Sequence, residues 1–276
     1  MRAHEEEFAV RLMCRVLSVS ASGYYDWRKR GPSKRAQARV ELDVQVKARF
    51  TARKSRDGAP RLSRHLHRGR RQVAMSLRRQ GLRAKAARKF TATTNSNHSL
   101  PVAENLLQQN FTADRANQVW VGDITFIGTD QGWLYLAVVM DLYSRRVVGW
   151  SMGDRMPASL VCDALRMALF NRGMPRGVIV HTDRGSQYCS HQHRDLLDQH
   201  GLIASMSAKG NCYDNAAMES WNHSLKVEAI HGERFATREQ ARAHVFEYIE
   251  VDYNRNRLHS TLGYLTPEQF EQENAA

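Results

Sequence analysis

The 276-residue chain has an ordinary globular composition, with 42% hydrophobic and 25% charged residues. It has no apolar run long enough to span a bilayer, and its four scattered cysteines form no C-x-x-C pair, which favours a cytoplasmic protein without membrane or disulfide chemistry. The net charge of +13 is uneven: residues 1–118 hold 26 Lys and Arg against 9 Asp and Glu, whereas residues 119–276 hold 15 against 19. One part is therefore expected to meet a polyanion such as DNA.

The basic part is predicted to be helical. A first helix is expected over Glu5–Leu17, with one apolar stripe formed by Phe8, Leu12, Val16 and Leu17. Short polar residues then favour a turn and a second helix around Tyr24–Trp27. This order is typical of a helix-turn-helix that enters a DNA groove, although any small helical hairpin has the same pattern.

Further helices are expected before a linker. Ser33–Arg53 reads as a helix with Val40, Val44 and Phe50 as candidate buried residues, and Pro60 is placed to start another. The polar stretch 91–101 is the predicted linker. Four basic residues before it are predicted to contact DNA phosphates, with a merely solvated connector as the alternative: Arg83, Lys85, Arg88 and Lys89.

The second part is strand-rich. Strands are expected at Val119–Ile127, Trp133–Met140 and Arg145–Ser151, and the short gaps between them imply an antiparallel meander. A helix over Ala158–Asn171 is followed by Gly177–Thr182, a short apolar run that suits a central strand.

The remaining elements complete an α/β order. They are a helix over His191–His200, a strand over Leu202–Met206 and a long helix over Asp214–His231. The sequence of elements, β-β-β-α-β-α-β-α, is that of a ribonuclease H-like fold, a mixed sheet with helices on both faces. We expect a basic helical region over residues 1–105, this core over 106–235, and a helical tail over 236–276.

Three acidic residues occupy places where a charge is otherwise costly. Asp123 interrupts an apolar strand, Asp183 follows the short buried strand, and Glu219 lies among apolar residues of the long helix. Carboxylates at strand ends and inner helix faces are suitable ligands for Mg²⁺, which prefers hard oxygen donors. Asp141, at the end of the second strand, is the main competitor, and is more simply explained as the cap of a turn before Ser144.

The residues around these acids resemble a known family. The stretches Trp120–Thr125, His181–Tyr188 and Gly210–Ser220, with Lys226 seven residues after Glu219, are similar to transposases of bacterial insertion sequences in the retroviral integrase (DDE) superfamily. The closest class is the one whose transposase is assembled from two overlapping reading frames. The resemblance covers about residues 10–270 and is most specific from Trp120 onward.

The resemblance implies a function and a site. Asp123, Asp183 and Glu219 would bind two Mg²⁺ ions, for which Mn²⁺ can substitute, and would catalyse nicking at the ends of an element and transfer of the freed 3′-hydroxyl into DNA. The implied partners are double-stranded DNA, further copies of the chain and the upstream-frame protein, and the implied location is the bacterial nucleoid. A nuclease without strand transfer and a catalytically dead DNA-binding remnant are the alternatives.

Neighbouring residues have weaker predicted roles. Lys226, two helical turns after Glu219, is expected to reach a phosphate beside the metals, with a solvent-facing lysine as the alternative. Arg184 is expected to touch DNA, although an ordinary turn is equally compatible. His181 is expected to be a packed strand-end residue, because magnesium avoids imidazole.

The sequence also departs from the family pattern. Asp57 stands before Gly58 where relatives usually carry a tyrosine, and the helical stretch after it looks short, so an altered DNA-binding region is one expectation. After Glu219 the chain reads Ser-Trp-Asn where many relatives have paired aromatics, and little consequence is expected from that change.

Overall fold

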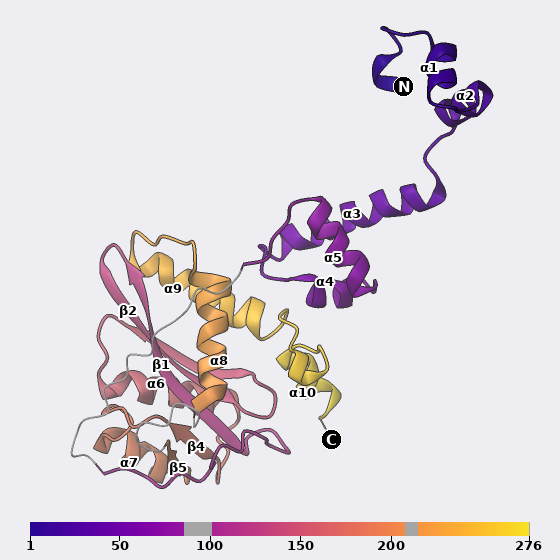
Figure 1. Ribbon diagram of the computed structural model, residues 1–276. Coiled ribbons are helices and arrows are strands. Elements are labelled where there is room, and N and C mark those ends of the chain that lie inside the picture. The colour runs from indigo at the N-terminus through magenta and orange to yellow at the C-terminus, as the bar shows by residue number, and fades with distance from the viewer. Residues whose placement is uncertain (86–100, 208–214, 276) are drawn as a thin grey trace. The chain divides into compact units, whose positions relative to one another are not determined.

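The computed structural model describes residues 1–85, 101–207 and 215–275 (Figure 1). The chain forms two compact units, Met1–Ala84 and Lys85–Ala276. The boundary expected near residue 105 falls inside the second unit, because the segment before the first strand packs on that unit: Leu107 is buried in its core, and the Leu106 amide donates to Ser205 Oγ at 3.0 Å. Nearly all of the expected linker, 91–100, lies outside the described residues.

The first unit is helical, as expected. Its elements are η1 (Arg2–His4), α1 (Val10–Val16), α2 (Ala21–Lys29), α3 (Lys34–Ala52), α4 (Ala59–His65) and α5 (Arg70–Arg79). Ser20 and Ser33 cap α2 and α3 by accepting from the amides of Gly23 and Ala36.

The apolar residues expected to form a stripe on the first helix are exposed. The helix is shorter than predicted, and the four stripe residues are all open to solvent: Phe8, Leu12, Val16 and Leu17. Val40 and Val44 are exposed as well, whereas Phe50 is buried. The physical reason is the flank on which they lie: Leu42, Val46 and Phe50 face the core that α3 forms with α4 and α5, whereas Val40 and Val44 are on a flank of α3 that faces away from it.

Asp57 is the charged centre of the α3–α5 core. Its side chain is 0% exposed and receives Arg53 Nε at 2.9 Å, Arg61 Nη1 at 3.4 Å and His65 Nε2 at 3.3 Å. Burial alone would raise the pKa of this carboxyl, but the contacts with His65 and Arg53 outweigh it and hold the pKa at about 2. The residue that departs from the family pattern is therefore built into the packing of this unit.

We predict that Asp57→Asn destabilises the α3–α5 region by about 3–5 kcal/mol, because it leaves buried cations without their partner. The folded-state pKa is below the ordinary 3.8, so the stabilisation by Asp57 is present above about pH 4 and is lost as the pH falls toward 2. Hydrogen exchange of the α3–α5 amides in the full chain measures the effect. Asp43→Asn, which breaks a half-exposed pair with Arg79, is the control, and an equal loss in both variants would contradict the role of Asp57.

The second unit is built on a mixed five-stranded sheet. Its strands are β1 (Val119–Thr129), β2 (Gly132–Asp141), β3 (Val147–Gly153), β4 (Ile179–Thr182) and β5 (Ile203–Met206), in the order β3-β2-β1-β4-β5. The first three strands are antiparallel, whereas β4 runs parallel to β1 and β5. The predicted meander, the inner position of β4 and the ribonuclease H-like fold class are confirmed.

Helices cover both faces of the sheet (Figure 1). α6 (Ala158–Asn171) and α7 (His191–Gln199) pack on one face. The other face carries α8 (Ala216–Leu225), the π-helical turn η3 (Lys226–Ile230), α9 (Arg238–Phe246) and the π-helical η4 (Glu247–Tyr253). Gly149 in β3 permits the close approach of α6, because a Cβ there would stand 2.2 Å from the Ala164 carbonyl oxygen.

Alternate side chains of β1 lie on opposite faces of the sheet. Trp120 belongs to the core under α6 and α7, whereas Val121 belongs to the core under α8 and α9. Because alternate residues of a strand point to opposite faces, Asp123 lies on the α8 face with Val121.

The expected C-terminal tail is part of this unit. α9 and η4 contribute Val245, Tyr248 and Ile249 to the same core as β1 and β2. The chain ends with η5 (Ser260–Leu262) and α10 (Pro267–Glu273), and Glu271 of α10 pairs with Arg146 and Arg172. Across the described ranges, no helix has the length and apolar character that a membrane crossing needs.

Candidate active site

The sheet brings Asp123 and Asp183 together. Parallel pairing of β1 with β4 sets Val119 opposite Ile179 and Val121 opposite His181. Continued by two residues, that register sets Asp123 opposite Asp183, at the point where β4 ends. Neighbouring strands lie about 4.8 Å apart, so two residues that are 60 apart in sequence meet at one edge of the sheet.

Each aspartate is held by its own surroundings. Asp123 Oδ1 accepts from the Ile124 amide at 2.8 Å, and Asp123 Oδ2 accepts from Asn222 Nδ2 of α8 at 2.7 Å. Asp183 Oδ1 accepts from the Gly185 amide at 2.9 Å. The Ser-Trp-Asn stretch was expected to have little consequence, but Asn222 is a direct partner of Asp123. Its spacing of three residues from Glu219 places both side chains on one face of the helix and could have indicated this role.

The two carboxylates are electrostatically coupled. Burial raises the pKa of Asp123 to about 7, and the negative charge of Asp183 adds to the rise. Glu219 raises it further, by less than Asp183 does, while the hydrogen bonds from Ile124 and Asn222 oppose the shift. The fold thus holds acidic groups against each other, which is the electrostatic setting of a metal or catalytic site.

Asp123 and Asp183 open into a cleft of about 450 Å³. One side is formed by the loop after β4, including Gly185 and Gln187, and the other by an aromatic group on β1 and β2: Phe126, Trp133 and Tyr135. Trp133 is 52% exposed and meets Phe126 edge to face at 4.9 Å between ring centroids. It is an aromatic side chain at the rim of the cleft.

Glu219 is near the pair but does not line the cleft. It lies in the first turn of α8, on the same flank as Asn222. Within the described residues, no group of three or more His, Cys, Asp or Glu side chains is arranged to hold a metal ion. The structure therefore brings two of the three predicted ligands together. Residues 208–214, which include the expected start of the long helix at Asp214, lie outside the described residues, and α8 begins at Ala216.

Lys226 is not a solvent-facing lysine. Its Nζ donates to the Phe126 carbonyl oxygen and lies 4.9 Å from the centroid of the Phe126 ring, which itself lines the cleft. Burial lowers the pKa of this ammonium group to about 8. Lys226 is thus held beside the cleft by Phe126, which stands three residues after Asp123 on β1.

The other predicted DNA contacts differ in their surroundings. Arg184 Nε donates to the Ser207 carbonyl at 2.6 Å, so it joins the loops after β4 and β5. Arg83 is exposed, whereas Lys85 Nζ lies 3.3 Å from Glu233. Arg88 and Lys89 lie outside the described residues.

His181 and Asp141, the two other candidates for a catalytic or metal-binding role, have structural explanations. His181 is fully buried, with Nδ1 2.9 Å from Ser205 Oγ, which confirms the packed strand-end histidine. Asp141 is also fully buried; it accepts from the Tyr143 amide at 3.1 Å and pairs with Arg172. It caps the turn after β2, as expected.

The residues present fit a hard divalent cation. Asp123 and Asp183 offer oxygen donors at one strand edge, and Mg²⁺ is bound in proteins through one or two carboxylates while it keeps several waters. A cation between them would relieve the repulsion that raises the pKa of Asp123. The donor set has no thiolate and no imidazole, so the chemistry favours magnesium or manganese over zinc.

Comparison with known proteins defines the class. Two integrase core domain models match residues 113–212 and 219–274, which cover the sheet and the helices around it. The second unit is therefore an integrase core.

Full-length relatives define the family. The transposase InsF for insertion sequence IS3A of Escherichia coli (strain K12) is 58% identical over 280 residues, covering 99% of this chain and 97% of that protein. An insertion element IS600 uncharacterized 31 kDa protein of Shigella sonnei is 46% identical, covering 95% of this chain and 98% of that protein. The chain belongs to the InsF transposase family of insertion sequence IS3, and the resemblance seen in the motifs is confirmed.

Solved structures give a more distant likeness. A simian T-cell lymphotropic virus intasome in complex with PP2A regulatory subunit B56 gamma is 17% identical, with a TM-score of 0.45 over 82% of this chain and 73% of that one. The HTLV-2 integrase catalytic core domain in complex with magnesium is 16% identical, with a TM-score of 0.41 over 56% of this chain and 96% of that one.

We predict that Asp123→Asn stabilises the metal-free protein at pH 8 but not at pH 4. The folded-state pKa of Asp123, about 7, is above the ordinary 3.8, so the folded protein favours the neutral carboxyl. As the pH rises through 7 the carboxyl ionises and the free energy of unfolding falls. At about 1.4 kcal/mol per pKa unit, the gain at pH 8 is a few kcal/mol at most. Thermal unfolding with a chelator measures it, with Asp195→Asn, an exposed acid of α7, as the control. The coupling is absent if the gain is the same at both pH values.

Proposed function

We propose that this transposase nicks DNA at the ends of an insertion element and transfers the freed 3′-hydroxyl into a second DNA site, using Asp123, Asp183 and Glu219 as ligands for two Mg²⁺ ions. The supporting observation is the register-matched pair of Asp123 and Asp183, whose carboxylates repel each other at the edge of an open cleft. Membership of the transposase family supports the reaction class.

The three carboxylates come from different elements. Asp123 and Asp183 stand on adjacent strands and form a rigid donor pair, and Glu219 supplies the third carboxylate from α8. Asn222 fixes the orientation of Asp123 through its hydrogen bond to Oδ2. When bound, a pair of divalent cations would activate the attacking oxygen and stabilise the leaving oxygen, and Mn²⁺ would serve in place of Mg²⁺.

No side chain of the cleft is needed as a covalent nucleophile. Tyr188 is buried behind the two aspartates, and burial together with their charges raises its pKa well above 10. Its hydroxyl therefore keeps its proton and does not attack DNA. Water for nicking and the 3′-hydroxyl for joining are the nucleophiles of the proposed reaction.

The basic first unit is assigned to DNA binding. Its excess of arginines is suited to phosphate contacts, and the α1–α2 hairpin is the candidate groove-reading element. The proposal includes a multimer on paired element ends, the upstream-frame protein as a partner, and action at the bacterial nucleoid.

We predict that Asp123→Asn, Asp183→Asn and Glu219→Gln each reduce nicking and joining about a thousandfold or more, because loss of a metal ligand removes several kcal/mol of transition-state stabilisation. A labelled, pre-cleaved element end incubated with target DNA reports joining directly. DNA affinity should remain within a few-fold of the wild type, and Asp195→Asn should keep full activity.

Two results would change the proposal. A wild-type protein that cleaves but never yields joined product would be a nuclease of the same fold. A wild-type protein that is inactive with both Mg²⁺ and Mn²⁺ yet binds DNA would be a catalytically dead remnant. Full activity in Glu219→Gln alone would remove Glu219 from the site and leave the two aspartates.

We predict that Lys226 makes affinity for element ends pH-dependent. Its pKa of about 8 means that the ammonium group is charged below pH 8 and neutral above it, so attraction to a phosphate is lost as the pH rises from 7 to 9. Fluorescence anisotropy with a short element end should show weaker binding at pH 9, and Lys226→Gln should abolish that difference. Lys47→Gln, an exposed lysine of α3, should keep it.

A further inference from the structure

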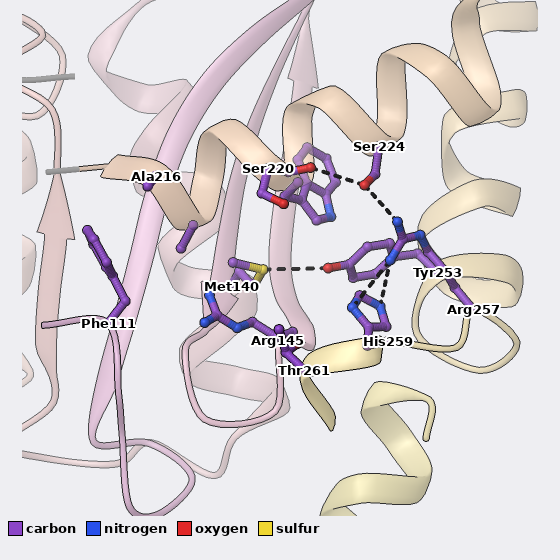
Figure 2. Close-up of a pocket in the computed structure, with 12 residues that line it drawn as sticks. Phe111, Met140, Arg145, Ala216, Ser220, Ser224, Tyr253, Arg257, His259 and Thr261 are labelled. Atoms are coloured by element: carbon purple, nitrogen blue, oxygen red, sulfur yellow. Dashed lines mark hydrogen bonds between the residues drawn. The ribbon is translucent and has the colours of Figure 1, made fainter. Parts of the chain in front are cut away.

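A second cavity is lined by one flank of α8 (Figure 2), and helical spacing sets Glu219 on the opposite flank. At 3.6 residues per turn, Ala216, Ser220 and Ser224 share one flank of α8, whereas Glu219 and Asn222 share another. The cavity walls come from that first flank, the turn between β2 and β3, and the C-terminal segment after η4; they include Phe111, Arg145, Tyr253, Arg257, His259 and Thr261. The cavity is therefore separated from the acidic cleft by the body of the helix.

Two hydrogen-bond donors at this cavity lack partners. Trp221 lines it and is only 2% exposed, yet its Nε1 makes no hydrogen bond in the described part of the chain. Arg145 extends from the β2–β3 turn toward Phe111 (Figure 2), and no carboxylate or carbonyl among the described residues pairs with it. A buried donor without an acceptor is uncommon and costly, so Trp221 Nε1 points to an acceptor that comes from outside the chain. Arg145 is half-buried, so its guanidinium group remains open to a ligand that enters the cavity.

The charge of the cavity favours an anion. None of the described residues that line it is acidic. Arg257 is not available, because Nε donates to Glu228 at 2.9 Å and Nη2 donates to Ser224 Oγ at 2.8 Å. Arg145 is left as the cation of the cavity, with the hydroxyls of Ser220 and Thr261 beside it. Burial lowers the pKa of its guanidinium group, which an incoming anion would reverse.

The size of the cavity limits the anion. Its volume is about 230 Å³, which is below the usual range of about 300–1,000 Å³ for small-molecule sites. A single phosphate group fits that description better than a cofactor does. Arginine is also the side chain best suited to phosphate, because its planar fork donates two parallel hydrogen bonds.

We propose that Arg145 and Trp221 form a phosphate-binding pocket that holds one backbone phosphate of bound DNA on the far side of α8 from the catalytic acids. The inference rests on the proposed function in so far as DNA is the ligand. A strand anchored there would pass over α8 and fix this helix, which carries Glu219, against the DNA.

The test is the salt dependence of DNA binding by the full chain, measured in a chelator with a short duplex. Each phosphate contact contributes about 0.9 to the slope of log affinity against log salt concentration. Arg145→Gly should therefore make the slope shallower by about 0.9. Glycine suits this position because Arg145 has φ +60°, a backbone conformation that glycine adopts without strain. Arg145→Gln is a second variant that keeps most of the side chain.

Two further variants separate the pocket from general charge. Arg176→Ala removes an exposed arginine outside the pocket and should leave the slope unchanged. Trp221→Phe removes a neutral donor, so it should weaken binding without changing the slope. Thermal unfolding of each variant identifies any that do not fold. An unchanged slope in folded Arg145→Gly and Arg145→Gln would overturn the proposal.

A separate arm identifies the source of the phosphate. Inorganic phosphate should raise the melting temperature of the wild type and not of Arg145→Gly. If it does so while the DNA slope is the same in both proteins, the pocket takes free phosphate and the DNA assignment is wrong. The slope is measured without metal, so a wild type that fails to join DNA would count against the proposed reaction and leave this test intact.

Discussion

The repulsion between Asp123 and Asp183 is the constraint on which the catalytic unit depends. Parallel pairing of β1 with β4 places the two carboxylates side by side at the cleft, where desolvation of Asp123 and the negative charge of Asp183 both raise the pKa of Asp123. A protein selected for stability alone would gain by neutralising one of them. The arrangement is reasonable if the repulsion is relieved during function, as it would be by a cation held between the two groups.

Different flanks of α8 face the acidic cleft and the second cavity. One flank presents Glu219 and Asn222 to the acidic cleft, another lines the cavity with Ser220 and Ser224, and Met218 and Leu225 anchor the helix in the core. The change from α-helix to π-helix begins at Lys226. π-Helical turns often occur at functional sites, and this one coincides with the lysine beside the cleft.

The sequence predicted the second unit better than the first, for physical reasons. Strand alternation and short gaps determined the meander, and the apolar run before Asp183 determined the inner strand, because a buried sheet imposes a strict pattern. In the first unit, periodicity marked Phe8, Leu12 and Val16 as one helical stripe, but the helix begins only at Val10 and all three side chains are exposed, since few elements are available to bury them.

The site was predictable in part. Asp123 was predictable as a charge inside an apolar strand, and Asp183 as the residue that follows a short buried strand. The hydrogen bond of Asn222 to Asp123 and the unpaired state of Arg145 depend on how α8 and the β2–β3 turn pack on the sheet, which no local pattern encodes. Two partners of Asp57, Arg53 and Arg61, stand only four residues from it, but its complete burial depends on how α3, α4 and α5 pack, which the spacing does not show.

The last helix, α10, closes a charge network that reaches deep into the sheet. Glu271 meets Arg172 at the end of α6, and Arg172 in turn reaches the fully buried Asp141 at the end of β2. Three layers of the unit are thus joined through one residue five positions before Ala276. A chain shortened by a premature stop before Glu271 would keep every catalytic candidate and still lose the counter-charge for Arg172, so the extreme carboxyl terminus is a poor place for truncation or for a tightly fused tag.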